Sequence, residues 1–120
     1  MPEYRIMIVD DETEVREGIA SRVDWKAAGF TIVATAENGQ DALEKAEFLD
    51  LDVVLTDIKM PYMDGLTLGA ELLSRYPATK LIILSGFDEF EYAKEAIKLN
   101  VLEYVLKPVN ADELLLVLQR

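Results

Sequence analysis

Several apolar runs of this sequence are followed directly by side chains that could bind or transfer a phosphoryl group. Asp10 and Asp11 come after the first run, and Asp57 ends the run VVLTD. Ser85 and Lys107 follow two later runs. If these runs are parallel strands of one sheet, their carboxyl ends lie along one edge, where open α/β sheets bind ligands. We therefore expect three carboxylates, a hydroxyl and an ammonium group to converge.

Carboxylates placed so close together need positive charge nearby. Two of them within about 5 Å repel each other by roughly 3 kcal/mol at an effective dielectric of about 20. Lys107 supplies one positive charge, and a hard divalent cation would supply the rest. The sequence contains no His and no Cys, so the ligands are oxygens, which favour Mg²⁺ or Mn²⁺ over zinc. A site with few protein ligands suits Mg²⁺, which keeps several waters.

This combination of groups predicts phosphoryl transfer to a carboxylate. Asp57 is the better nucleophile because its strand is central, and the adjacent pair Asp10 and Asp11 is better suited to holding metal. The cation and the lysine would neutralise phosphoryl oxygens while a carboxylate oxygen attacks phosphorus in line. The predicted product is an aspartyl phosphate.

Each of these residues also has a simpler interpretation. Asp57 could merely end a strand and begin a turn. The acidic stretch 10–12 could be a helix start that complements the helix dipole. Lys107 could be a surface lysine, and Ser85 part of an ordinary turn. The functional interpretation depends on all of them standing at equivalent positions.

The hydrophobic pattern predicts five strands that alternate with five helices. Short apolar runs place strands at residues 4–9, 31–36, 51–56, 80–84 and 102–106. Helices are expected around Val15, Ile19 and Val23 with Thr13 as N-cap, over residues 40–49, from Leu66 through Ala70 and Leu73, over 89–99, and after an Asn110 cap. Such alternation favours a parallel sheet with helices on both faces. Trp25 and Phe30 are expected to close one end of the core.

Length and composition narrow the function further. The 120 residues suit one domain, and the net charge of −11 disfavours a nucleic-acid surface. The lack of Cys excludes disulfides and thiolate nucleophiles and fits a reducing cytoplasm. The longest apolar run is too short to span a bilayer. We expect a soluble, cytoplasmic protein with no membrane segment.

The motifs together resemble the receiver domain of two-component response regulators. The resemblance extends over essentially the whole chain and rests on Asp10-Asp11, Asp57 with Met60-Pro61 and Met63-Asp64-Gly65, Ser85-Gly86, and Lys107-Pro108. It implies an α/β, flavodoxin-like, doubly wound five-stranded parallel sheet with strand order 2-1-3-4-5 and five helices. Residues 1–120 would form a single receiver domain.

The resemblance also implies a role for each matching residue. Asp57 would be the phosphoacceptor, and Mg²⁺ would be held by Asp11, Asp57 and the main-chain carbonyl of Lys59, with Asp10 acting through water. Ser85 and Lys107 would contact the phosphoryl group, Tyr104 would be the switch aromatic, and Lys107-Pro108 would be a cis peptide. Ser85 stands where the family more often has Thr.

A narrower resemblance concerns the parent protein. The segments DW…GF at 24–30 and LSGFDEFEYA at 84–93 look like receivers that precede an AraC-type DNA-binding region. The implied partner is a sensor histidine kinase, and DNA would be reached only through a C-terminal region outside these residues. A homodimer through the last two helices and the fifth strand is a family expectation.

Two other classes of function are alternatives to a phosphoacceptor switch. An aspartate-nucleophile phosphatase would carry Asp-x-Asp after its first strand, and neither acidic stretch has that spacing. A receiver-fold binding module without phosphorylation would be expected to lack an acidic residue or the lysine, and all are present. We therefore predict a phosphoacceptor switch that is not an enzyme beyond its own phosphorylation and dephosphorylation.

Overall fold

The computed structural model describes residues 4–58, 60, 62–85 and 103–106, with Ser85 and residues 103–106 described as backbone only. Within these described residues, five strands and three helices follow one another in the order β1 (Tyr4–Val9), α1 (Thr13–Arg22), β2 (Phe30–Ala36), α2 (Gly39–Ala46), β3 (Val53–Asp57), α3 (Gly65–Arg75), β4 (Lys80–Ser85) and β5 (Glu103–Leu106). The predicted helices at 89–99 and after Asn110 lie outside the described residues.

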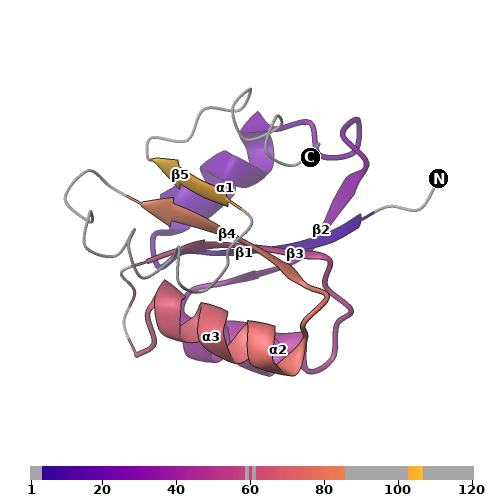
Figure 1. Ribbon diagram of the computed structural model, residues 1–120. Coiled ribbons are helices and arrows are strands. Elements are labelled where there is room, and N and C mark those ends of the chain that lie inside the picture. Colours follow the sequence, from indigo (N-terminus) through magenta and orange to yellow (C-terminus); the bar gives the residue numbers. More distant parts are fainter. Residues whose placement is uncertain (1–3, 59, 61, 86–102, 107–120) are drawn as a thin grey trace.

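The strands form one parallel sheet in the order β2-β1-β3-β4-β5, which confirms the predicted order (Figure 1). The sheet is wound in both directions from β1, because the chain goes first to β2 on one side and then to β3 on the other. Right-handed crossovers in opposite directions place helices on opposite faces. The carboxyl ends of β1 and β3 therefore meet where the chain reverses its direction of travel.

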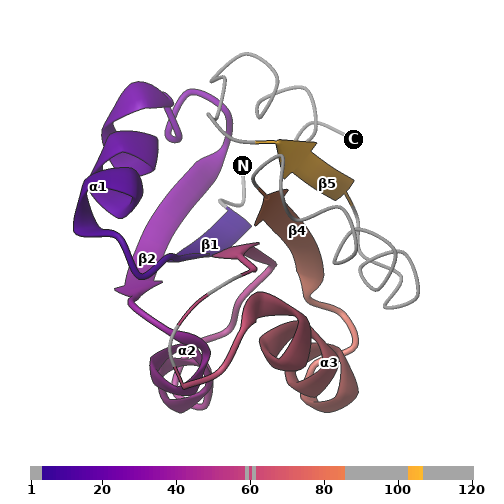
Figure 2. The ribbon, with the colours of Figure 1, turned by 90° about the vertical axis from the view of Figure 1, so that its left-hand side faces the viewer.

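The sheet is covered on both faces (Figure 2). Alternate residues of each strand point to opposite sides. One core joins the side chains of Ile6, Ile8, Val53, Leu55, Ile82 and Leu84 to α1 and the segment after it, through Ile19, Val23, Trp25 and Phe30. The other joins Met7, Val9, Val54, Leu81 and Ile83 to α2 and α3. Each fully buried Ile or Leu contributes about 1.5–3 kcal/mol.

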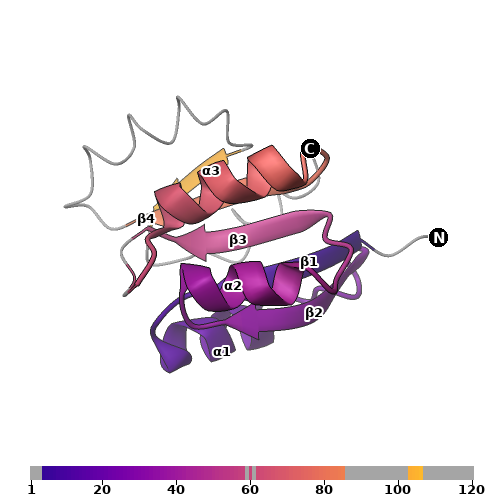
Figure 3. The same cartoon turned by 90° about the horizontal axis from the view of Figure 1, so that it is seen from below.

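Strand β3 is the central strand of the sheet, between β1 and β4, and both of its faces are covered (Figure 3). Every one of its residues is buried, as its unbroken apolar pattern predicts. Strands covered on both faces read as continuous β-branched runs because neither face meets water. Asp57, the last residue of β3, is buried with the rest of the strand.

Trp25 and Phe30 close the end of one core, as predicted. Both are buried, their rings meet edge to face at 6.3 Å between centroids, and the Trp25 Nε1–H donates to the Ile19 carbonyl at 3.3 Å. The indole N–H is thereby paired inside an apolar setting, where a lost partner would be costly. This packing ties the connection after α1 to the amino end of β2.

Two local predictions were wrong. Thr13 is the first residue of α1 and Glu12 is the N-cap, because the Glu12 carbonyl already accepts from the Val15 and Arg16 N–H groups. Helix α2 begins at Gly39 and ends at Ala46, not Leu49, because the chain turns there through Phe48 N–H to Lys45 and Leu49 N–H to Ala46.

The helix predicted from Leu66 through Leu73 is α3. Asp64 caps it, and its fully buried side chains are Leu68 and Leu72. Leu66 and Leu73 are half-buried and pack against the core, whereas Ala70 is exposed.

Candidate functional site

The register of the sheet places Asp10 beside Asp57. In the pairing of β1 with β3, Val9 lies opposite Thr56, so the next residue of each strand, Asp10 and Asp57, stands at an equivalent position. Neighbouring strands are about 4.8 Å apart. The two acids that were predicted to converge are thus brought together by the backbone itself, at the edge that Figure 2 views.

Asp10 is fully buried and its backbone and side chain are both held. Its N–H donates to the Ala36 carbonyl at 3.0 Å, which continues the β1–β2 pairing by one residue. Its carboxylate accepts from the Glu12 N–H at 2.9 Å, and its carbonyl accepts from the Arg16 guanidinium at 2.6 Å. These bonds set the direction of the turn into α1.

Asp57 is 5% exposed, and its carboxylate Oδ1 accepts from the Ile58 N–H at 2.8 Å. Its carbonyl accepts from the Thr56 hydroxyl at 2.9 Å. A carboxylate is rarely this buried without a partner or a function. Asp57 is therefore largely shielded from solvent and lies at the carboxyl end of its strand.

Three carboxylates converge in the β1–α1 turn. Oxygens of Asp10, Asp11 and Glu12 lie within 4.8 Å of one another; Asp10 is buried and the other two are exposed. An all-oxygen donor set with open positions fits Mg²⁺, which takes one or two carboxylates and keeps waters. Asp57 adjoins this group through the register of β1 and β3.

The loop after Asp57 is packed tightly against the site. A Cβ built on Gly65 would lie 1.9 Å from the Asp57 carbonyl oxygen, so only glycine allows α3 to begin here. The Gly65 N–H donates to the Ile58 carbonyl at 2.7 Å. Asp64 caps α3 by accepting from the Thr67 N–H at 2.7 Å. The Met-Asp-Gly motif therefore serves to bring the helix start up against the carboxyl end of β3.

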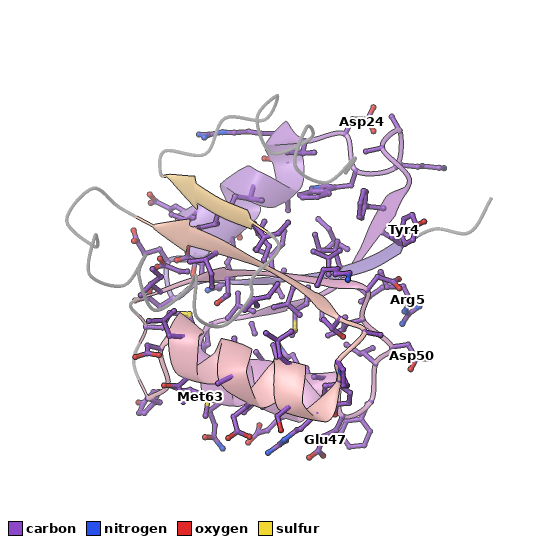
Figure 4. The ribbon with its side chains drawn as sticks, in the orientation of Figure 1. Tyr4, Arg5, Asp24, Glu47, Asp50 and Met63 are labelled. Carbon is purple, nitrogen blue, oxygen red and sulfur yellow. The ribbon has the colours of Figure 1, made fainter. Side chains whose placement is uncertain are left out.

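The same loop contacts α2 on its other side. The Gly39 N–H donates to the Met63 carbonyl at 3.2 Å, and a Cβ on Gly39 would come within 2.8 Å of Met63 atoms. Met63 lies beside the end of α3 at which the helix begins (Figure 4). Tyr62, just before it, has φ of 70° and is 91% exposed. The site loop is thus anchored to two helices.

The remaining predicted residues are placed only in part. Asp57 pairs with Leu84 across β3 and β4, so Ser85 stands one position further along the same edge. Tyr104 lies in β5 opposite Ile83. Lys59, Lys107 and Pro108 lie outside the described residues, and so does the cis peptide that was predicted between Lys107 and Pro108.

Three residues at the site were not predicted to have a role there. Glu12 completes the carboxylate group, Arg16 binds the Asp10 carbonyl, and Gly65 makes the close approach. Glu12 could have been found from its neighbours in sequence. Arg16 could not, because a basic residue on the first turns of a helix has no signal that marks it from any other.

The fold and site together define a receiver domain. The sequence model of the response regulator receiver domain family matches residues 6–119, and the chain belongs to that family. A receiver domain is a signalling switch rather than a classical enzyme, and receivers of transcriptional regulators take their signal from histidine kinases. Receiver domains generally bind Mg²⁺ at their acidic pocket.

Relatives of the chain are found among transcriptional regulators. It is 42% identical over 112 residues to the uncharacterized transcriptional regulatory protein YesN of Bacillus subtilis, covering 93% of this chain and 30% of that protein. It is 36% identical to the transcriptional regulatory protein HptR of Staphylococcus aureus, covering 98% of this chain and 46% of that protein. The chain thus spans less than half the length of these relatives.

Solved structures agree with the fold. The receiver domain of AraT, a response regulator from Geobacillus stearothermophilus, has a TM-score of 0.90 at 40% identity, with 97% of this chain and 92% of that chain covered. A two-component transcriptional regulator from Clostridium phytofermentans has a TM-score of 0.89 at 38% identity, with 98% and 91% covered. Among the described residues no helix is long and apolar enough to cross a membrane.

Proposed function

We propose that this chain is a Mg²⁺-dependent phosphoacceptor that takes a phosphoryl group from a histidine kinase onto Asp57. One observation carries the proposal: a buried aspartate ends the central strand, directly beside a buried aspartate of the neighbouring strand. Burying two adjacent carboxylates is costly unless a cation or hydrogen bonds compensate. A fold retains such an arrangement for function.

Asp11, Asp57, Asp10 through water, and the Lys59 carbonyl are the proposed Mg²⁺ ligands. When bound, the cation neutralises charge on the phosphoryl oxygens. An Asp57 oxygen attacks phosphorus; the bond from phosphorus to the leaving group breaks, and the leaving group departs with its electron pair. The Ile58 N–H donates to Oδ1 of Asp57 at 2.8 Å and helps to hold the carboxylate in place for this attack.

Ser85 and Lys107 are proposed to contact the phosphoryl oxygens, and Tyr104 to report their position to the surface. In support, Ser85 ends β4 one residue beyond the partner of Asp57, and Tyr104 lies on the neighbouring strand. Phosphorylation must favour the active surface by a few kcal/mol to switch the output. The acyl phosphate would be lost again by hydrolysis within the same domain.

The output is proposed to be transcription. We infer that residues 1–120 form one receiver domain at the start of a longer cytoplasmic regulator; in support, the chain matches only 30% and 46% of the length of two transcriptional regulatory proteins. The domain itself would not bind DNA, because its net charge is −11. A homodimer through β5 and the last two helices predicted from the sequence is proposed to couple phosphorylation to DNA binding by the longer protein.

Intact mass after incubation with acetyl phosphate and Mg²⁺ tests the proposal. We expect one added phosphoryl group in the native chain, and none in Asp57→Asn or in a sample treated with EDTA. Asp52→Asn is the matched control, since it removes one carboxylate from the opposite end of β3 and should not prevent labelling. Because the acyl phosphate can be short-lived, beryllofluoride binding would be measured in parallel. Failure of both would refute the proposal.

A further inference from the structure

Arg16 is bonded to the acidic turn at two separate points. Its guanidinium donates to the Asp10 carbonyl at 2.6 Å and to the Thr13 hydroxyl at 3.2 Å. Its own N–H donates to the Glu12 carbonyl at 3.1 Å. The side chain is half-buried, so these bonds are partly shielded from water.

The guanidinium donates to a carbonyl and a hydroxyl of the turn. Arg16 therefore adds a positive charge to the same turn that carries the three carboxylates. A planar guanidinium presents several N–H groups in a fixed geometry, which suits two acceptors at once. Lysine offers a single compact charge and could satisfy one of them.

The turn that Arg16 holds is also the turn that presents the carboxylates. Asp10 is fixed by Ala36 on one side and by Arg16 on the other, and the Glu12 N–H closes onto the Asp10 carboxylate at 2.9 Å. With the Asp10 carbonyl held, the peptide between Asp10 and Asp11 has one orientation. The direction of the Asp11 side chain follows from that orientation.

We propose that Arg16 is a positioning residue that sets these carboxylates in place before a cation arrives. This inference rests on the proposed function, since it concerns the same Mg²⁺ site. Two effects of the side chain oppose each other: its charge repels a cation, and its bonds order the ligands. The structure favours ordering, because the guanidinium is bonded to the backbone of the turn.

The test compares Mg²⁺ affinity in Arg16→Gln, Arg16→Lys and the native chain. Affinity is measured by ¹H–¹⁵N NMR titration, following the amide signal of Glu12. If Arg16 orders the ligands, Arg16→Gln should bind Mg²⁺ about tenfold more weakly, as is typical when groups that support metal ligands are lost. Arg16→Lys should lie between the two. In the metal-free Gln variant, the Glu12 amide should exchange faster with solvent.

Arg22→Gln is the matched control, because it removes the same charge from the last turn of the same helix. It should leave Mg²⁺ affinity within twofold of native. The thermal midpoint of each variant, measured with EDTA, separates loss of folding from loss of positioning.

Three results would overturn the inference. Tighter Mg²⁺ binding by Arg16→Gln, with Arg16→Lys unchanged, would mean that charge repulsion dominates. Lower thermal midpoints with unchanged affinity would mean that Arg16 only stabilises the fold. A native chain that binds no Mg²⁺ would refute the proposed function as well, and so would be told apart from the other two.

Discussion

Asp52 at the amino end of β3 and Asp57 at its carboxyl end differ in what surrounds them. Asp52 is exposed, its carboxylate accepts from the Arg5 N–H at 2.7 Å, and its carbonyl accepts from the Lys80 N–H at 2.8 Å. It thereby links three strands. Asp57 is buried and stands beside a group of other acids.

The two ends of the sheet therefore use acidic residues for different purposes. At the amino end, the Arg5 side chain also donates to the Asp50 carbonyl at 2.8 Å, and both labelled residues lie far from Met63 in Figure 4. There the Asp52 carboxylate joins the start of β3 to β1. At the carboxyl end, like charges are concentrated, which costs stability and favours binding of a cation. At the amino end Asp52 stabilises the pairing of the strands, whereas the acids at the carboxyl end form the candidate site.

The largest effect is expected from Gly65→Ala. The new Cβ would clash with the backbone of Asp57, which cannot rotate away, so we expect a loss of about 3 kcal/mol or more in the free energy of unfolding. Urea denaturation measures it. Gly18→Ala in α1 is the control: its Cβ meets only the Arg22 side chain at 3.8 Å, and it should gain up to about 1 kcal/mol. Equal effects at the two glycines would refute the close approach.

Mg²⁺ should stabilise the protein through the carboxyl end alone. At ten times its dissociation constant, a ligand that binds only the folded state adds about 1.4 kcal/mol. The thermal midpoint should rise with Mg²⁺ in the native chain and in Asp52→Ala. It should not rise in Asp11→Asn. A rise that survives in Asp11→Asn would place the cation elsewhere.

Asp52→Ala should lower the free energy of unfolding by about 1 kcal/mol, because the Arg5 N–H loses its acceptor. Chemical denaturation in EDTA measures the change. Glu44→Ala, an exposed site on α2, should change stability by less than about 0.5 kcal/mol. If the two variants behaved alike, the structural role assigned to Asp52 would be wrong.

Asp11→Asn should raise the free energy of unfolding, and this is the smallest of the expected effects. Removing one of three adjacent carboxylates relieves repulsion, so the metal-free protein should gain about 0.5 kcal/mol. Glu44→Gln makes the same change in net charge away from the site and serves as control. A loss of stability in Asp11→Asn would show that its carboxylate supports the fold.

Much of the fold could be predicted from the sequence. The bounds of β1 were predicted without error and those of β2 and β4 to within one residue, because buried strands are unbroken apolar runs. Helix ends and faces were less well predicted. Helix α3 was predicted, but its most buried side chains, Leu68 and Leu72, were not among the residues that indicated it.

Part of the candidate site could be predicted as well. Asp10, Asp11 and Asp57 were expected at one edge because each follows a strand, and strand ends share an edge in a parallel sheet. Gly65 and Arg16 could not be given their roles in this way, since each acts through a contact with the main chain of a distant or folded segment.

The residue types alone indicate which segments form strands and which acids follow them, and therefore which end of the sheet carries the candidate site. These are local properties: each depends on the types of neighbouring residues and on the period of the apolar pattern. Only the tertiary structure shows that Val9 lies opposite Thr56, and hence that Asp10 stands beside Asp57. Register is set between segments far apart in the chain, and β3, buried along its whole length, has no alternation of apolar and polar residues that would fix it.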